Sequence, residues 1–360
     1  MLRIAIVGCG KISDAHATAI LANKNCRIVG VCDQEELMAR QFKERFPVDG
    51  TYDDLDGLLE KAQPEVVHIT TPPQSHFAIA KRCLNKGCHV YIEKPFTVST
   101  AEAIELINLA EATGLKLTAG HDDQFSPVAR RLRTLVNSGY LGGLPVHMES
   151  YYCYEMSGAY ANALLGDRQH WVRNLPGQLL HNIISHGIAR IAEYLQTESP
   201  EVIAHGFTSP NLRALGENDI IDELRVIISE NKSTTAFFTF SSQIRPSLHQ
   251  FRIYGNQNGL IIDQDNQTLI RLRGKRYPSY AENFIPPLSF SRQYLSNLVY
   301  NARLFMTRNF HVKAGMRWLI ESFYGAIVDG KPLPITYREI ILTSRIMDSI
   351  FEQLRPQKRI

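Results

Sequence analysis

Two short motifs follow strand-like runs and carry groups that could bind a dinucleotide. Gly8-Cys9-Gly10 lies between an apolar run and a helical pattern. In that context the glycines allow a tight turn and a close approach of backbone to a diphosphate. The third position of the G-x-G-x-x-G pattern is Ser13, so the glycine motif is incomplete. Asp33 ends the second run and could accept hydrogen bonds from ribose hydroxyls, which predicts NAD in preference to NADP.

Two further motifs could act on a substrate hydroxyl. Thr71-Pro72 ends a third strand-like run, with His76 just beyond, and Glu93-Lys94-Pro95 ends a fourth. Ligands of open α/β sheets bind outside the carboxyl ends of the strands, which is where these residues would lie. The ammonium group of Lys94 could lower the pKa of a substrate hydroxyl or stabilise a developing alkoxide.

Strands whose carboxyl ends share one edge are needed to bring these side chains together. The first 120 residues alternate β-branched runs with helical patterns, which is typical of βαβ units in a doubly wound parallel sheet. We therefore predict a Rossmann domain over residues 1–122. Its strands are expected at 3–7, 28–32, 66–70, 89–92 and 115–119, and its helices near 12–23, 75–86 and 100–113.

The pattern changes after residue 122, so a second domain is expected over residues 123–360. Helices are predicted near 126–138 and 177–196, and again at the end of the chain over 312–355. Short runs with polar turns between about 200 and 272 indicate a mostly antiparallel sheet. The fold class is therefore α/β, with an N-terminal Rossmann domain and a C-terminal α+β domain.

Residues 288–310 interleave aromatic and aliphatic side chains with arginines. We expect an amphipathic helix that packs on the second domain or on a neighbouring subunit. A helix on a membrane surface is the alternative. The basic residues could receive an anionic substrate such as a nucleotide sugar, or they could form a solvated face. They are Arg292, Arg303, Arg308, Lys313 and Arg317.

Taken in order, the motifs of the first domain resemble those of the Gfo/Idh/MocA oxidoreductases, the glucose–fructose oxidoreductase and inositol dehydrogenase family. The resemblance implies a Rossmann domain followed by a domain with a large antiparallel sheet, through which members form dimers or tetramers. Phe251–Asp263 is similar to a strand–turn–strand of that domain. The resemblance further implies NAD as cofactor, held by Gly8, Gly10, Lys11, Ile12, Asp33, Thr71, Pro72, His76, Glu93, Lys94 and Gln124.

The resemblance extends to a second catalytic motif. His186 occupies the position of the family's acid/base histidine, and Asn182 stands where the family has an aspartate. Positions i and i+4 share a helix face, so both could reach one substrate. An asparagine can hydrogen-bond the imidazole but cannot raise its basicity as an aspartate would. The implied catalytic residues are Lys94, His186 and Asn182, and the implied substrate-binding residues are Lys94, His121, Trp171, Arg173, Asn182 and His186.

The segment 120–127 departs from the family's pattern. Gln124 replaces an arginine, and Asp122 replaces an asparagine. His121 adds an imidazole, which is a second candidate base if His186 is weak. These changes indicate a subgroup with its own substrate.

Composition excludes several classes of protein. The chain has 360 residues, 44% of them hydrophobic, and a net charge of +3, which does not indicate nucleic acid binding. It has no apolar run of transmembrane length, and we interpret its short N-terminal apolar run as a first strand rather than a signal peptide, so no membrane contact is expected. The six cysteines lack zinc spacing. We expect reduced, buried thiols, no metal site and a cytoplasmic location.

The expected function is an NAD-dependent oxidoreductase acting on a hydroxyl carbon of a sugar, polyol or nucleotide sugar. His186 would take the hydroxyl proton, and Lys94 would stabilise the charge on the same oxygen. Two other functions stay open. One is an NAD-requiring glycoside hydrolase or lyase that works by transient oxidation. The other is a non-catalytic NAD-binding sensor, for which Asn182 and Gln124 leave room.

Overall fold

The computed structural model describes residues 1–230, 233–307, 309–310 and 313–355. They form two compact units, Met1–Asp122 with Gly315–Arg345, and Asp123–Ala314 with Ile346–Ile360. The sequence prediction placed all of 123–360 in one domain, whereas the structure assigns Gly315–Arg345 to the first unit. The reason is that this late segment packs on the first sheet: the Tyr324 hydroxyl lies 2.7 Å from Nε2 of His68.

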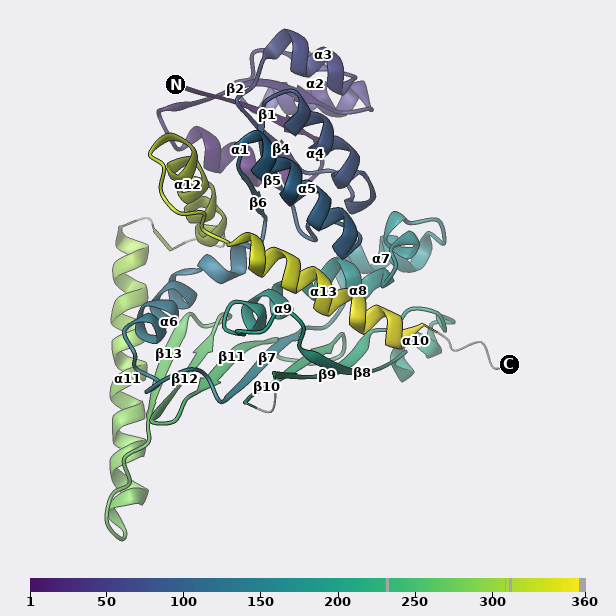
Figure 1. Cartoon of the computed structure of the whole chain (residues 1–360). Helices are drawn as coiled ribbons and strands as arrows, with labels where there is room; N and C mark the ends of the chain where they lie inside the picture. Colours follow the sequence, from purple (N-terminus) through teal and green to yellow (C-terminus); the bar gives the residue numbers. More distant parts are fainter. Residues whose placement is uncertain (231–232, 308, 311–312, 356–360) are drawn as a thin grey trace. The chain divides into compact units, whose positions relative to one another are not determined.

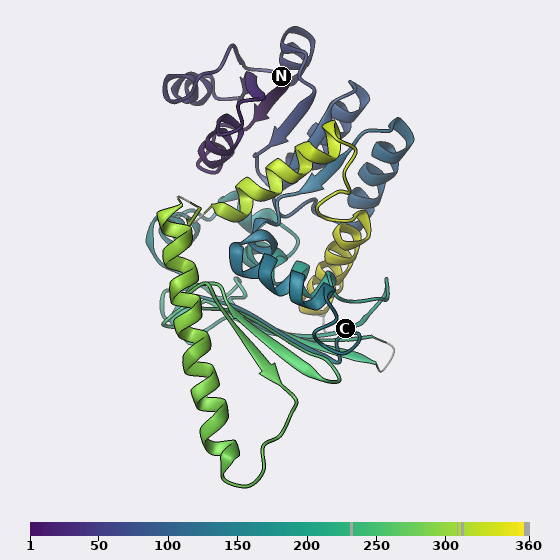
Figure 2. The same cartoon turned by 90° about the vertical axis from the view of Figure 1, so that its left-hand side faces the viewer.

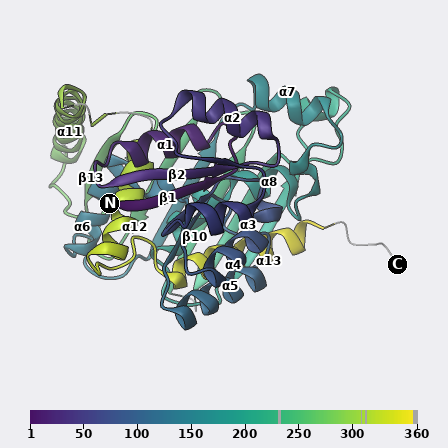
Figure 3. The same ribbon diagram turned by 90° about the horizontal axis from the view of Figure 1, so that it is seen from above.

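The first unit contains the predicted Rossmann sheet. Six strands are ordered β3-β2-β1-β4-β5-β6, and every neighbouring pair is parallel. Helices cover both faces, with α1 and α2 on one side and α4 and α5 on the other (Figure 3). The strands are β1 (Leu2–Val7), β2 (Cys26–Cys32), β3 (Thr51–Tyr52), β4 (Val66–Ile69), β5 (His89–Ile92) and β6 (Leu117–Ala119). The helices are α1 (Ser13–Leu21), α2 (Glu36–Arg45), α3 (Leu55–Gly57), α4 (His76–Asn85), α5 (Thr100–Thr113), α12 (Ala314–Val328) and the first part of α13 (Tyr337–Leu354).

Local sequence explains why these elements agree with the prediction. The strand β4 is buried along its whole length, as expected for a parallel strand covered on both faces. The helix α5 begins where the Ser99 side chain accepts a hydrogen bond from the backbone N–H of Glu102. It ends at Gly114, whose φ of 68° suits a glycine cap.

The second unit is built on a seven-stranded sheet in the order β13-β12-β11-β7-β10-β9-β8 (Figure 1). The β7–β10 pair is parallel and the others are antiparallel, which confirms the predicted mostly antiparallel sheet. The strands are β7 (His147–Cys153), β8 (Glu201–Phe207), β9 (Glu223–Glu230), β10 (Thr234–Ser241), β11 (Leu248–Tyr254), β12 (Asn258–Asp263) and β13 (Thr268–Arg273). The helices are α6 (Pro127–Asn137), α7 (Gly158–Gly166), α8 (Gln178–Ile183), α9 (Ser185–Ala192), α10 (Pro210–Ala214), α11 (Ala281–Met306) and the end of α13.

Two parts of the second unit differ from the prediction. The strand β7, near the middle of the sheet, was not expected, because its sequence HMESYYC lacks a clear alternation of apolar and polar residues. The helix expected over 177–196 is divided into α8 and α9, which are separated at Ile184. The predicted strand–turn–strand over 251–263 is confirmed as the β11–β12 hairpin.

The helix α11 lies along the edge strand β13 (Figures 1 and 2), and two of its amide side chains bind the backbone of that strand. The Asn297 side chain donates to the carbonyl of Leu269 at 2.9 Å and accepts from its N–H at 3.2 Å. Gln293 makes the same two bonds with Arg271, at 3.2 and 2.7 Å. The helix predicted over 288–310 is present as α11 and contacts this domain through amide side chains, while packing on a neighbouring subunit or a membrane surface stays a prediction. The edge strand offers unpaired N–H and C=O groups, which amides can satisfy and apolar side chains cannot.

The backbone of the other edge strand, β8, is also bound by an amide side chain. Gln353 of α13 donates to the carbonyl of Val202 at 2.9 Å and accepts from the N–H of Ala204 at 3.0 Å. Amide side chains thus pair with the backbone of both outermost strands.

Of the basic residues near α11, Arg317 belongs to the first unit and pairs with Glu321 at 2.8 Å. Arg308 lies outside the described residues. All six cysteines are free and buried. None of the described helices is long and apolar enough to cross a membrane.

Candidate functional site

The turn after β1 has the shape that the glycine motif predicts. Gly8 has a φ of 96°, and a Cβ there would lie 2.8 Å from Cγ2 of Thr71, so the protein's own packing requires glycine. A Cβ at Gly10 would meet open space. Gly10 is therefore not needed by the fold, and it leaves room for a ligand at the start of α1. Lys11 is exposed there, and Ile12 is half-buried.

Asp33 follows β2 and is held by backbone groups. Its Oδ2 accepts from the N–H of Cys9 at 2.7 Å, and its Oδ1 accepts from the N–H of Glu35 at 3.0 Å. Each carboxylate oxygen keeps a further lone pair. The carboxylate is thus oriented beside the glycine turn, with acceptor capacity left for a diol. These features of Gly10 and Asp33 fit an adenosine dinucleotide.

His76 connects the turns that follow β4 and β5. Its Nε2 lies 2.8 Å from the Thr71 carbonyl, and its Nδ1 lies 3.0 Å from the Pro95 carbonyl. Burial lowers the pKa of the imidazole, although the hydrogen bonds to backbone raise it. Both ring nitrogens of His76 thus face the protein. Its observed contacts hold the Thr71-Pro72 turn against the Glu93-Lys94-Pro95 turn.

Glu93 is buried at the end of β5. Its Oε1 lies 2.8 Å from Nε2 of His16, and its Oε2 accepts from the backbone N–H of Lys94 at 3.2 Å. Burial alone would raise the pKa of Glu93, but the hydrogen bond from His16 and the charge of Lys94 outweigh it and set the pKa to about 2. The carboxylate is therefore ionised in the folded protein. Lys94 itself is half-buried, and His121, after β6, is buried in the same unit.

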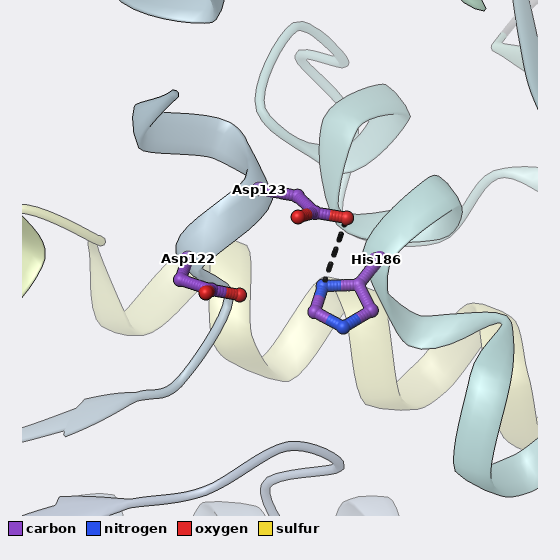
Figure 4. Close-up of side chains that lie close together, drawn as sticks. All are labelled: Asp122, Asp123 and His186. Carbon is purple, nitrogen blue, oxygen red and sulfur yellow. Dashed lines mark ion pairs between the residues drawn. The ribbon is translucent and has the colours of Figure 1, made fainter. Parts of the chain in front are cut away.

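In the second unit, His186 faces a carboxylate that the sequence analysis did not choose. Asp123 Oδ2 lies 3.6 Å from Nδ1 of His186 (Figure 4) and 4.0 Å from a terminal nitrogen of Arg190. Burial would raise the pKa of Asp123, but the charges of His186, Arg190 and His249 outweigh it and hold the pKa below its ordinary value. An imidazole with a carboxylate at Nδ1 can present Nε2 to a substrate.

Aromatic rings pack around this pair. The Tyr152 ring stacks on His186 at 5.6 Å between centroids, and Arg190 lies over the same tyrosine ring at 5.6 Å. His249 packs edge-on against Tyr152 at 4.6 Å and pairs with Asp265 at 2.7 Å. Tyr152 and His249 are opposite each other in the β7–β11 register. The sheet thus provides a rigid support for the His186 ring.

The remaining predicted residues of this unit are engaged by the protein. The Asn182 side chain donates to the Tyr160 hydroxyl at 2.9 Å. Gln124 donates to Glu193 at 3.0 Å and to the Ala189 carbonyl at 3.2 Å. Both therefore hold neighbouring helices.

Arg173 is also held by its own unit. Its guanidinium pairs with Glu217 at 2.6 Å and donates to the Leu164 carbonyl at 2.9 and 3.1 Å. Trp171 precedes it in a short 3₁₀ turn and stacks on His170 at 5.6 Å. Much of the donor capacity of Arg173 is thus used within the protein.

The neighbours of His186 that the sequence analysis missed are Asp123, Arg190, Tyr152 and His249. Arg190 had a detectable signal, because it follows His186 by four residues and shares its helix face. Asp123 had no such signal in the sequence. It is 63 positions away from His186 along the chain and comes close to it only through the fold.

Comparison with known proteins agrees with the geometry of the first unit. Residues 2–121 match the model of an oxidoreductase family with an NAD-binding Rossmann fold, Gfo/Idh/MocA. Over 151 residues the chain is 32% identical to a 1-carboxy-3-chloro-3,4-dihydroxycyclo hexa-1,5-diene dehydrogenase of Comamonas testosteroni, covering 42% of this chain and 38% of the relative. Over 149 residues it is 32% identical to a UDP-N-acetylglucosamine 3-dehydrogenase of Acidithiobacillus ferrooxidans, covering 41% and 44%. The chain thus spans less than half the length of these curated relatives.

The whole chain is similar in fold to solved structures. One is the WlbA dehydrogenase of Bordetella pertussis in complex with NADH and UDP-GlcNAcA, with a TM-score of 0.78 and 14% identity over 98% of this chain and 95% of that one. At that identity the likeness concerns the fold. Residues 2–121 are therefore similar to the NAD-binding Rossmann domain of the Gfo/Idh/MocA oxidoreductase family.

Proposed function

We propose that the protein is an NAD-dependent oxidoreductase that acts on a hydroxyl carbon of a sugar, polyol or nucleotide sugar. The observation that carries the proposal is the His186–Asp123 pair in a chain whose first unit has the NAD-binding turn. The nucleotide-sugar class is supported by two of the proteins it resembles.

His186 is the proposed general base. It takes the hydroxyl proton at Nε2, and the nearby carboxylate of Asp123 stabilises the imidazolium that forms. In this role Asp123 replaces the aspartate that the family has at position 182. His186 therefore still has a carboxylate beside it, although position 182 is an asparagine.

Lys94 is proposed to donate a hydrogen bond to the same substrate oxygen and to stabilise its developing negative charge. Gly8, Gly10 and Asp33 are proposed to bind the diphosphate and ribose of NAD, and Asp33 would repel the 2′-phosphate of NADP. Bound NAD supplies the acceptor for the hydride that leaves the substrate carbon.

A face of the second sheet supports the proposal of a homodimer or homotetramer. Ile203, Ile227 and Phe237 are cross-strand neighbours and are 56%, 45% and 44% exposed. Such an apolar patch is typical of a surface that associates with another copy. The six buried free cysteines are in keeping with a cytoplasmic location.

The test begins with NADH and NADPH binding to stripped protein, followed by assays of NADH formation with UDP-N-acetylglucosamine, glucose and myo-inositol. We expect selective NADH binding and turnover with one of these classes. Substrate conversion without net NADH formation would favour the hydrolase or lyase. NADH binding without any conversion would favour the sensor.

Lys94→Ala tests the role of the lysine. We expect turnover to fall by at least about a thousandfold, within the range for a lost electrostatic stabiliser, while NADH affinity changes little. Lys86→Ala is the matched control, because Lys86 is an exposed lysine of the same unit paired with Glu60. Unchanged turnover in Lys94→Ala would refute the proposed role.

A further inference from the structure

A continuous chain of hydrogen-bonding side chains runs through the core of the first unit and ends at Glu93. The Tyr324 hydroxyl lies 2.7 Å from Nε2 of His68, and Nδ1 of His68 lies 2.8 Å from Nδ1 of His16. Nε2 of His16 lies 2.8 Å from Oε1 of Glu93. The two histidines have no exposed surface, and Tyr324 and Glu93 are 4% and 6% exposed.

The ionised carboxylate at one end fixes the first hydrogen of the chain. Glu93 can only accept, so Nε2 of His16 carries a hydrogen. If His16 is neutral, its Nδ1 has a lone pair and accepts from Nδ1–H of His68. His68 then presents an unprotonated Nε2, which accepts the hydroxyl hydrogen of Tyr324.

A neutral His68 is common to both directions of the chain, so the direction depends on the protonation of His16. Burial keeps His68 neutral, because it lowers the pKa of that ring well below its ordinary value. The Tyr91 ring also stacks on it at 4.7 Å. A doubly protonated His16 would reverse the chain, with His68 donating to the Tyr324 oxygen.

We propose that Tyr324, His68 and His16 are positioning residues, and that their one-directional hydrogen-bond chain orients the Glu93 carboxylate and the backbone of Lys94 that it binds. The role of Lys94 as the group that contacts substrate rests on the proposed function. The direction of the hydrogen-bond chain is independent of the proposed function.

The far end of the chain lies next to a cavity of the same unit. Tyr324 lines a cavity of about 530 Å³ together with Asn23, Glu321 and Lys331. The chain therefore extends from this cavity to the end of β5, and a change at Tyr324 can be made without altering Glu93 or Lys94 directly.

Two tyrosines beside His68 provide a matched pair of variants. Tyr324→Phe removes the hydroxyl that donates to His68. Tyr91→Phe removes a buried hydroxyl that has no hydrogen-bond partner among the residues the structure describes. Both changes delete one oxygen next to the same imidazole, so only the first should disturb the chain.

The direct test is nitrogen-15 NMR of the imidazole rings in the full chain near neutral pH, without substrate. His16→Gln and His68→Gln assign the signals. We expect the Nε2–H form of His16 and the Nδ1–H form of His68. Tyr324→Phe should leave His68 in its Nδ1–H form but shift the signal of its Nε2, which loses the hydrogen bond from the hydroxyl, and Tyr91→Phe should leave both rings unchanged. A doubly protonated His16, or an unaltered Nε2 signal of His68 in Tyr324→Phe, would overturn the proposed direction.

Turnover then tests positioning. We expect kcat of Tyr324→Phe to fall about fivefold, with KM within about twofold, because misplacement near the reacting atoms acts on the chemical step. Tyr91→Phe should retain full kcat. If the ring signals change as expected but kcat does not, positioning of Lys94 is refuted and the proposed function stands. If the wild type converts no substrate, the proposed function and the Lys94 link fail together, while the ring signals still decide the direction.

Discussion

Glu93 in the first unit and Asp123 in the second are both carboxylates beside proposed catalytic groups, yet the protein holds them differently. Glu93 is buried and lies 2.8 Å from the His16 ring. Asp123 has a side chain that is 33% exposed, and its two cationic neighbours are 3.6 and 4.0 Å away. The first carboxylate is fixed by short hydrogen bonds. The second is held by charge at distances beyond a hydrogen bond.

The difference matches what each carboxylate has to do. Lys94 needs a constant orientation, so a rigid, buried partner suits it. As the proposed base, His186 would change its charge when it takes up and returns a proton, so its carboxylate would serve two states of the ring. A partner that can move closer when the imidazole is charged suits that task.

The largest expected effect is on stability, and it separates the two carboxylates. Glu93→Ala should lower the free energy of unfolding by about 3–5 kcal/mol, because it leaves the other members of a buried polar network unpaired. Asp123→Ala should lower it by less than about 1 kcal/mol, since its ion pairs are partly solvated. Urea denaturation near neutral pH measures both. Equal losses for the two variants would contradict the comparison.

A second prediction concerns acid. The pKa of Glu93 is about 2 in the folded chain, against an ordinary 4.5. A depressed pKa stabilises the fold fully above the ordinary value, and this stabilisation is lost as pH falls from about 4.5 toward 2. The stabilisation lost over this pH range is on the order of 3 kcal/mol.

Glu93→Gln lacks this titration, so its unfolding free energy should approach that of the wild type as pH falls through this window. Urea denaturation at several pH values measures the difference. A constant gap between the two proteins down to the lower end of the window would show that Glu93 is not ionised at ordinary pH.

The smallest expected effect is on catalysis. Asp123→Asn should lower kcat about tenfold, equivalent to about 1.4 kcal/mol, because the imidazolium loses a nearby negative charge. Stability should change little. Asp265→Asn is the matched control, since Asp265 pairs with His249 rather than with His186. A similar loss in both variants would assign the effect to general charge in the unit rather than to the His186 pair.

The motifs of the first unit could be placed from the sequence because each lies directly after a strand. Gly8, Asp33 and Lys94 needed only the order of strands and helices to be assigned to one sheet edge. The chain of His16 and His68 could not be found in this way. The two residues are 52 positions apart, and nothing local indicates that their rings meet.

The site of the second unit was harder to predict from the sequence for the same reason. Reasoning along one helix connected His186 with Asn182, whereas the structure places Asp123, from the start of the unit, at the imidazole. The strand β7 was missed because its inward residues include Ser150 and aromatic side chains rather than a run of aliphatic ones. The sequence pattern does not reveal polar contacts between segments that are distant along the chain.

The amides that pair with β13 and β8 have a consequence for assembly. A sheet with free outer strands can add strands from another molecule without limit, as fibrils do. Here Asn297 and Gln293 occupy backbone groups at one end of the sheet, and Gln353 does so at the other. Polymerisation by strand addition is obstructed at both ends. The broad face that carries Ile227 and Phe237 is where we propose that a second copy associates, and isologous association through such a face would close after a small number of subunits.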